Sequence, residues 1–180
     1  RPISALVDIT NYLTFDRGRP LHVFDAKKVV GNLVVRRARA GESIIALDGK
    51  TYELGADNIV IADDKGVHDI AGIMGGEHSG VSESTTDVLL EIAYFDPARI
   101  GATGRKLGLS SDARTRFERG VDPAFLDAGL DLLTGLIVDL AGGTPSEAVR
   151  AGSPPSAAKV VAFDPGLTLR LGGVEVPEGE

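Results

Sequence analysis

The sequence predicts an α+β fold in which layered, sandwich-like sheets carry helices packed on one side, in a three-layer β/β/α arrangement. The elements follow the order of one helix, a block of short strands and then further helices. This order is typical of segregated layers rather than of a doubly wound parallel sheet. The chain has 180 residues, of which 43% are hydrophobic and 25% charged, which is ordinary for one globular domain with a packed core.

The first predicted element is a helix over residues 2–14. Pro2 suits its first turn, because a missing N–H costs nothing at that position. The apolar stripe of this helix consists of Ile3, Leu6, Val7 and Leu13. Residues 16–20 contain Gly and Pro and end the helix, so residues 21–25 are expected to be irregular or extended.

Strands are predicted between residues 33 and 95. Each run is short, rich in Val, Ile and aromatic residues, and bounded by Gly, Asp or Asn. The runs are residues 33–38, 43–47, 51–54, 58–63, 68–73 and 88–95. Asp48-Gly49 separates two of them and indicates a hairpin whose two central residues have positive φ.

Two Asp-Pro pairs predict the starts of helices. Asp96-Pro97 offers an N-cap followed by a first-turn Pro, and predicts a short helix to about Leu107. Asp122-Pro123 opens a longer helix that Gly142-Gly143 ends. The apolar face of this longer helix consists of Leu126, Leu130, Leu133, Ile137 and Leu140.

A domain boundary is expected in the Gly/Pro/Ser-rich stretch 142–156. We expect one domain over residues 1–150, followed by a linker and the truncated start of another domain over 151–180. A strand is predicted at 159–163 and a cap at Asp164-Pro165. Because the chain starts without Met and stops soon after a new unit opens, we interpret it as a piece of a longer protein.

Composition excludes several classes of protein. Without cysteine the chain has no disulfide scaffold, thiolate metal site or Cys nucleophile, which fits a reducing compartment. No stretch approaches the roughly 18 apolar residues of a membrane span, and the start lacks the pattern of a signal peptide. We therefore expect a soluble, cytoplasmic protein.

The net charge of −7 disfavours indiscriminate coating of nucleic acid. The charge is unevenly distributed, however, because residues 99–119 carry +4 and the rest of the chain −11. The basic residues of this stretch are Arg99, Arg105, Lys106, Arg114, Arg116 and Arg119. Such a cluster fits either one local contact with phosphate or a solvated helix face.

Glu91 and His22 are polar residues that stand within apolar segments, and both are candidates for a binding or catalytic site. Glu91 interrupts a run that reads as a strand buried on both faces, where an unpaired carboxylate costs several kcal/mol. It is either a structural or edge residue, or a pocket carboxylate that binds a polar group. His22 lies between apolar neighbours and is either a buried structural histidine or a pocket base that orients water.

Two further patterns have a structural and a functional interpretation. His68 and His78, with Asp69 and Glu77, match no familiar ligand spacing, so a metal site is disfavoured. Residues 72–76 read Gly-Ile-Met-Gly-Gly and fit no phosphate-binding motif. They form either a glycine-rich turn or a turn kept bare so that a ligand can approach the backbone.

With these residues in view, the sequence resembles the central editing domain of the β subunit of bacterial phenylalanyl-tRNA synthetase. The resemblance covers almost the whole chain and rests on several blocks in the same order. These blocks are RPISALVDITNY at 1–12, PLHVFD at 20–25, VIAD at 60–63, AGIMGGEHSGV at 71–81, LLEIAYFDP at 89–97 and GLSSDARTRFERGVDP at 108–123.

The resemblance implies hydrolysis of tyrosine wrongly esterified to phenylalanine tRNA. It places Glu91 on the tyrosine hydroxyl and His22 beside the scissile ester. It implies that polar groups of Arg1, Thr10 and Asn11 line the editing pocket. It also implies that the backbone of Gly75 forms one wall of the pocket, and that Ser111 and Ala113 lie on its rim. One departure is visible, because the family commonly has His-Thr-Asp-Ala-Ser where this chain has Ser110-Ser111-Asp112-Ala113-Arg114.

The expected chemistry is attack of water on the aminoacyl ester, positioned by His22 and Asn11 and by a ribose hydroxyl of the tRNA. Phenylalanine would leave the Glu91 charge desolvated and unpaired, at a cost of about 1–3 kcal/mol. There is no complete Ser-His-Asp set for a covalent intermediate, and no metal or cofactor is required in this domain.

The resemblance also implies partners and a parent enzyme. The domain would meet the acceptor end of tRNA(Phe), with Arg105, Lys106, Arg114 and Arg116 as contacts, and would join the α subunit through the full β subunit. The parent ligates phenylalanine to tRNA using ATP and Mg; no DNA or membrane partner is implied. The alternative is a non-catalytic tRNA-binding or scaffold domain of the same subunit.

Overall fold

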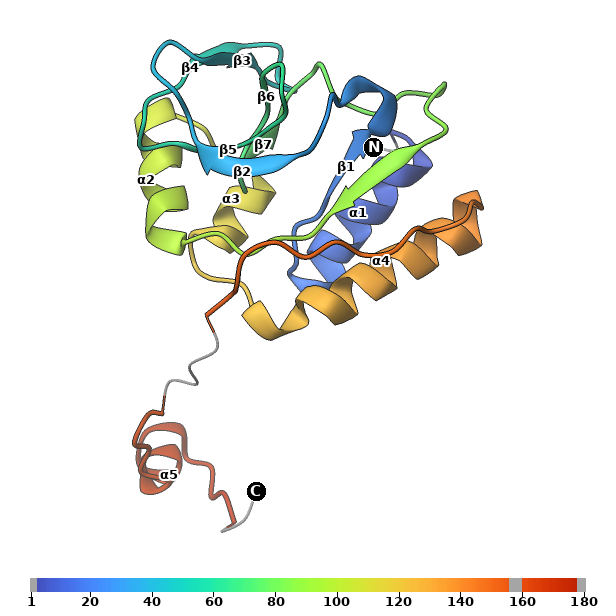
Figure 1. Ribbon diagram of the computed structural model, residues 1–180. Coiled ribbons are helices and arrows are strands. Elements are labelled where there is room, and N and C mark those ends of the chain that lie inside the picture. The colour runs from blue at the N-terminus through green and yellow to red at the C-terminus, as the bar shows by residue number, and fades with distance from the viewer. Residues whose placement is uncertain (1–2, 156–159, 178–180) are drawn as a thin grey trace.

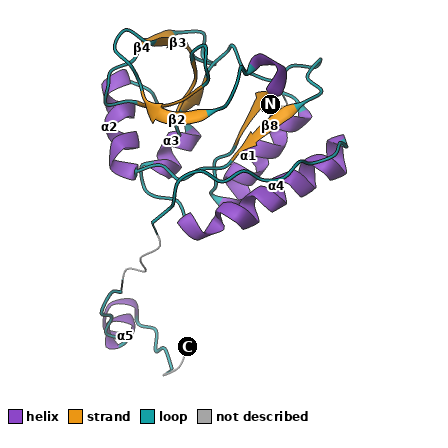
Figure 2. Cartoon of the chain, viewed as in Figure 1, coloured by secondary structure: helices purple, strands orange, loops and turns teal. Residues whose placement is uncertain are grey.

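The computed structural model describes residues 3–155 and 160–177, and the chain adopts an α+β fold with antiparallel sheets and packed helices (Figures 1 and 2). The expected α+β class is therefore confirmed. No helix within the described ranges is long and apolar enough to cross a membrane.

The strands form three antiparallel groups. A ribbon pairs β1 (His22–Asp25) with β8 (Val88–Glu91). A second sheet has the order β2 (Val34–Arg37), β5 (Ile59–Ala62), β6 (Val67–Ile70) and β7 (Met74–Gly75). A hairpin joins β3 (Ser43–Ile45) to β4 (Thr51–Glu53), and the bridge between Ala46 and Gly76 ties it to the end of β7.

The helices are α1 (Ala5–Arg17), α2 (Pro97–Leu107), α3 (Asp112–Phe117), α4 (Leu126–Ala141) and α5 (Gly166–Gly172), with 3-10 turns at Ala26–Lys28 and Pro123–Phe125. α2 and α3 lie beside the β2-β5-β6-β7 sheet, whereas α1 and α4 pack together beneath the β1–β8 ribbon (Figure 1). α5 stands apart from this body (Figure 1).

The predicted helix start at Asp96-Pro97 agrees with the structure, since capping depends on local sequence. The first helix runs over Ala5–Arg17 rather than residues 2–14, and α4 begins at Leu126, after the 3-10 turn at Pro123–Phe125. Asp96 accepts a hydrogen bond from the Arg99 N–H, and the helix ends at Leu107 as expected. Ser4 caps α1 by accepting from the Val7 N–H at 3.3 Å. The part of the first-helix prediction that involves Pro2 lies outside the described residues.

Several details of the sequence prediction are wrong. Ile3 and Leu140 are 72% and 68% exposed, so neither belongs to the buried stripe of its helix. Residues 160–163 form no strand, and the short helix α3 was not predicted. In the hairpin only Gly49 has positive φ (75°), and the Gly49 N–H donates to the Ala46 carbonyl, which closes a turn one residue earlier than expected.

The β1–β8 ribbon separates two apolar clusters. On one side, Ile9 and Leu13 of α1 meet Leu133 and Ile137 of α4, with Leu90 packed against them. On the other side, Phe24 belongs to the larger cluster that fills the space between the sheet, α2 and α3. Because side chains alternate along a strand, the face that carries Phe24 also carries His22.

Candidate active site

A pocket of about 60 Å³ lies where the β1–β8 ribbon meets the β6–β7 turn and α3. Its lining combines apolar walls with an imidazole and two carboxyl groups. It is lined by Pro20, Leu21, His22, Asp69, Gly72, Ile73, Met74, Gly75, Glu91, Phe95, Ala113 and Phe117. Four of the residues expected to form the site, His22, Glu91, Gly75 and Ala113, are therefore brought together.

The ribbon places His22 directly opposite Glu91. These two residues are partners in the antiparallel register of β1 and β8, so their side chains leave the same face of the ribbon. The expectation that the Glu91 strand is buried on both faces is wrong. No residue of β8 is fully buried and Leu89 is 39% exposed, because a ribbon of two strands has open edges.

His22 is held as a neutral imidazole. Its ring packs edge-on against Phe24, with 4.4 Å between ring centroids. Burial lowers the pKa of His22 to about 4. Its Nε2 atom is buried and has no hydrogen-bond partner among the described residues. A buried imidazole nitrogen that lacks a protein partner is available to a water or a ligand in the pocket.

Glu91 is held as a protonated carboxyl group near neutral pH. Burial, together with the charge of Asp69 and against that of Arg19, raises the pKa of Glu91 to about 8. This pKa favours the protonated form of Glu91 in the free protein at pH 7, whereas the sequence led us to expect a charged carboxylate. The group that a ligand meets there is mainly a carboxylic acid, which can donate as well as accept a hydrogen bond.

Asp69 is a pocket residue that sequence reasoning missed. It lies on β6, is 4% exposed, and its Oδ1 atom has no partner within the described part of the chain. Burial raises the pKa of Asp69 to about 7. The sequence carries only a weak signal for this role, because Asp69 follows the polar residue His68 instead of standing alone in an apolar run as Glu91 does.

Arg19 supplies the buried positive charge nearest to Glu91. It is 2% exposed, and its guanidinium donates to the Ala93 carbonyl at 3.0 Å and to the Asp122 carbonyl. Burial lowers the pKa of Arg19, which the charges of Asp122 and Glu91 counteract. Arg19 therefore ties the end of β8 to the start of the α4 region and anchors the wall that carries Glu91.

The glycine-rich turn 72–76 is bare because protein side chains fill the space beside it. A Cβ atom on Gly75 would lie 2.6 Å from Cε1 of His22 and 3.2 Å from Leu47. Gly72 has φ +69°, and a Cβ there would lie 2.8 Å from Phe95. Both glycines line the pocket, and Gly75 allows the imidazole to lie against the backbone.

Ser111 joins α3 to the pocket wall. Its hydroxyl donates to the Ile73 carbonyl at 2.6 Å and accepts from the Arg114 N–H at 3.0 Å, which caps the helix. This places Ala113, the second residue of α3, on the lining. Ser111 itself is not a lining residue, and both of its hydrogen bonds are made within the protein.

The other expected lining residues lie elsewhere. Thr10 is buried in α1, and its hydroxyl donates to the Val7 carbonyl at 2.8 Å. Asn11 is exposed on the same helix, and neither residue lines the pocket. Arg1 lies outside the described residues. The pocket geometry therefore gives the proposed role of Asn11 no support.

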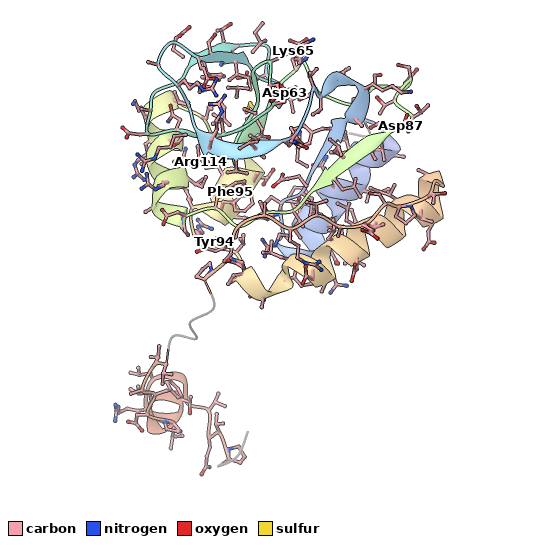
Figure 3. The ribbon with its side chains drawn as sticks, in the orientation of Figure 1. Asp63, Lys65, Asp87, Tyr94, Phe95 and Arg114 are labelled. Carbon is pink, nitrogen blue, oxygen red and sulfur yellow. The ribbon has the colours of Figure 1, made fainter. Side chains whose placement is uncertain are left out.

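The four basic residues expected to contact tRNA separate into two pairs. Arg114 lies against Glu118 at 3.0 Å and over Gly104, so its side chain is held between α2 and α3; it is labelled in Figure 3. Arg116 pairs with Asp112 at 3.3 Å. Arg105 and Lys106 are exposed in the last turn of α2. The latter two have the accessibility that a phosphate contact requires.

His68 belongs to a buried cluster outside the pocket. Its Nε2 atom lies 2.8 Å from Oδ2 of Asp63, and its ring stacks on that of His78 with 5.6 Å between centroids. Asp63 also accepts from the N–H groups of Val30, Lys65 and Gly66, and its pKa is lowered despite burial. Over the described ranges, no group of three or more His, Cys, Asp or Glu side chains could hold a metal ion.

The fold and the pocket define an α+β domain in which an imidazole and two carboxyl groups line one small cavity. Residues 1–142 match the family model described as the B3/4 domain, and the chain belongs to this family. The match ends where the Gly/Pro/Ser-rich stretch begins.

Relatives of high identity carry the name phenylalanine–tRNA ligase β subunit. The protein from Novosphingobium aromaticivorans is 63% identical over the whole chain, and that from Mesorhizobium japonicum is 60% identical. The chain spans only 23% and 22% of the lengths of these two relatives.

A solved structure shares the fold. It is an N-terminal fragment of the phenylalanyl-tRNA synthetase β subunit from Pyrococcus horikoshii, with a TM-score of 0.53 and 14% identity. The likeness covers 97% of this chain and 52% of that one.

Proposed function

We propose that the chain is the editing module of a phenylalanyl-tRNA synthetase β subunit and hydrolyses tyrosine wrongly esterified to tRNA(Phe). The observation that carries the proposal is the direct pairing of His22 with Glu91 on one small pocket. A buried imidazole nitrogen and a buried carboxyl group there both face a space that a ligand can enter. The names of the relatives support the choice of parent enzyme.

Glu91 recognises the phenol. A tyrosine hydroxyl satisfies the hydrogen-bonding capacity of the buried carboxyl group, whereas phenylalanine leaves it without a partner. Loss of a hydrogen bond to a buried polar group costs about 1–3 kcal/mol, so selectivity comes from the hydrogen bond that phenylalanine cannot make. Because Glu91 is mainly protonated in the free protein, this cost is that of an unpaired acid rather than of a full charge.

His22 positions the attacking water. With the ring neutral and its proton on Nδ1, the unpartnered Nε2 accepts a hydrogen bond from water. A pKa of about 4 makes it a weak base, so its contribution is mainly orientation, with the ribose hydroxyl of the tRNA assisting. Ser111 is already engaged in two hydrogen bonds, which favours water over a serine nucleophile.

The partners and location follow from the same proposal. The acceptor end of tRNA(Phe) reaches the pocket, with Arg105 and Lys106 as phosphate contacts, and the full β subunit joins the α subunit in the cytoplasm. ATP and Mg serve the ligation reaction of the parent enzyme and take no part in this domain. Residues 151–180 lead into the next domain.

A deacylation assay tests the proposal. Tyr-tRNA(Phe) and Phe-tRNA(Phe) are incubated with the chain, with the full-length β subunit that contains it, and with buffer. We expect faster loss of tyrosine than in buffer and little effect on phenylalanine. If neither protein accelerates loss of tyrosine, the domain is a non-catalytic tRNA-binding or scaffold module.

A further inference from the structure

Asp69 is a buried acid that the proposed reaction does not yet use. It projects from β6 into the same pocket as Glu91 and His22, and it is 4% exposed. Its Oδ1 atom has no hydrogen-bond partner in the described part of the chain. A buried polar atom without a partner indicates either a ligand contact or a group kept for its charge.

The register of the sheet explains why Asp69 reaches the pocket. Its partner on β7 is Gly75, so no side chain on that strand lies opposite it. Gly75 in turn lies against the His22 ring, which stands opposite Glu91 on the ribbon. Gly75 therefore brings the β6–β7 end of its sheet against the β1–β8 ribbon, beside the place where Asp69 lines the pocket.

The charges that face Glu91 are few. Asp69 approaches from β6, His22 from β1, and Arg19 from the segment between α1 and β1. His22 is neutral, so the opposing influences on Glu91 are one acid and one arginine. Two acids in one buried site do not both ionise readily, because the second charge is opposed by the first as well as by desolvation.

We infer that Asp69 is a specificity-determining residue that works as a pair with Glu91, the two carboxyl groups holding one proton between them when the pocket binds a hydroxyl group. This inference rests on the proposed function and extends it. A phenol hydroxyl is both a donor and an acceptor, and one carboxylate with one carboxylic acid is its complement. A phenyl ring offers neither group, and an ammonium offers only donors.

A titration of carboxyl groups by carbon-13 NMR in the free 180-residue chain tests the pairing without requiring activity. In wild type we expect Glu91 to titrate well above the usual range of glutamate. In Asp69→Asn the midpoint of Glu91 should fall by about one pH unit, because a like charge in the site is removed. Asp57→Asn is the matched control, since Asp57 is exposed and does not line the pocket.

The reciprocal variant guards against a failure of Asp69→Asn to fold. Asp69 releases its proton first, while Glu91 is still uncharged, so Glu91→Gln should move the Asp69 midpoint only slightly. The Asp69 titration curve, which in wild type also follows the ionisation of Glu91, should become a single-proton curve in that variant. An unchanged Glu91 midpoint in folded Asp69→Asn, or an unchanged shape of the Asp69 curve in folded Glu91→Gln, overturns the pairing.

The pH dependence of the selectivity for Tyr-tRNA over Phe-tRNA tests the role of Asp69 in specificity. The ratio of the Tyr-tRNA to the Phe-tRNA deacylation rate should change with pH around one midpoint. In Asp69→Asn this midpoint should move to lower pH by as much as the Glu91 midpoint moves in NMR. In Asp57→Asn it should stay unchanged. An active Asp69→Asn protein with an unmoved midpoint overturns the specificity role. If the wild type is inactive, the proposed function fails together with the specificity role, while the NMR midpoints still decide the coupling.

Discussion

His22 and Glu91 stand directly opposite each other in the β1–β8 ribbon, so one backbone register places an imidazole beside a carboxyl group. The pair does not form a salt bridge, because burial favours the neutral form of each side chain. Both groups therefore keep hydrogen-bonding capacity for a third molecule. This arrangement is suited to binding and positioning rather than to holding the fold together.

Glu91→Ala should reduce the preference for Tyr-tRNA over Phe-tRNA. The acid supplies the hydrogen bond that only tyrosine uses, so the loss should be about 1–3 kcal/mol of discrimination, or roughly 5- to 150-fold. Deacylation rates of the two substrates measured side by side give the ratio. A ratio equal to that of wild type would mean that Glu91 does not read the hydroxyl.

His22→Ala should slow deacylation on the order of tenfold or more while binding of mischarged tRNA is largely kept. The side chain orients water but does not hold the amino acid, so kcat should fall more than KM rises. Single-turnover rates at several enzyme concentrations separate the two. An inert substitution would make His22 a structural residue only.

Glu91→Gln should increase the free energy of unfolding, and the gain should grow with pH. The folded-state pKa of Glu91 is about 8 and the unfolded value is near 4.5, so the folded protein retains a proton that the unfolded chain releases. Wild type therefore loses stability as pH rises from about 4.5 to 8. We expect a gain of about 1 kcal/mol or more for Gln at pH 8 and little at pH 4, measured by urea denaturation.

Gly75→Ala should displace the His22 ring and impair both stability and deacylation. The new Cβ would lie 2.6 Å from Cε1 of His22, which the packing around Phe24 leaves little room to relieve, so we expect a loss of about 1–3 kcal/mol. Gly135→Ala is the matched control. Gly135 lies within α4 with nothing within 4 Å of its Cβ position, and alanine there should stabilise the chain by about 0.5–1 kcal/mol.

Ser111→Ala should destabilise the wall formed by α3. It removes the N-cap of the helix and the hydrogen bond to Ile73, at a cost of about 1–2 kcal/mol. Ser111→Thr introduces the residue that is common at this position in the family that the sequence resembles. It should retain the hydrogen bonds to the Ile73 carbonyl and from the Arg114 N–H. Thermal unfolding of the two variants compares them, and equal melting temperatures would show that the hydroxyl has no structural role.

Several features could be predicted because they depend on neighbours in the sequence. Asp96 and Pro97 define the start of α2 through capping, which acts within one turn. The apolar runs and their Gly and Asp boundaries located most strands. Glu91 was singled out because a carboxyl group inside an apolar run has an evident cost. The blocks that carry the family resemblance are likewise contiguous.

Other features required contacts between distant residues. The strand prediction at 88–95 was too long, because pairing with the four residues of β1 sets the length of β8. The sequence suggested that Arg114 contacts phosphate, but in the fold its side chain lies against Glu118 and Gly104. Asp69 lines the pocket because the fold brings β6 and β7 against the β1–β8 ribbon, which its local sequence does not reveal.

The sequence by itself determined the α+β class, the start of α2 and the two candidate site residues, His22 and Glu91. Local capping and apolar patterning are sufficient for these, because each acts over a few residues. Only the tertiary structure decided that the two face each other, that Asp69 joins them, and that Thr10 and Asn11 do not. Register, burial and the resulting protonation states depend on groups that the chain brings together from far apart.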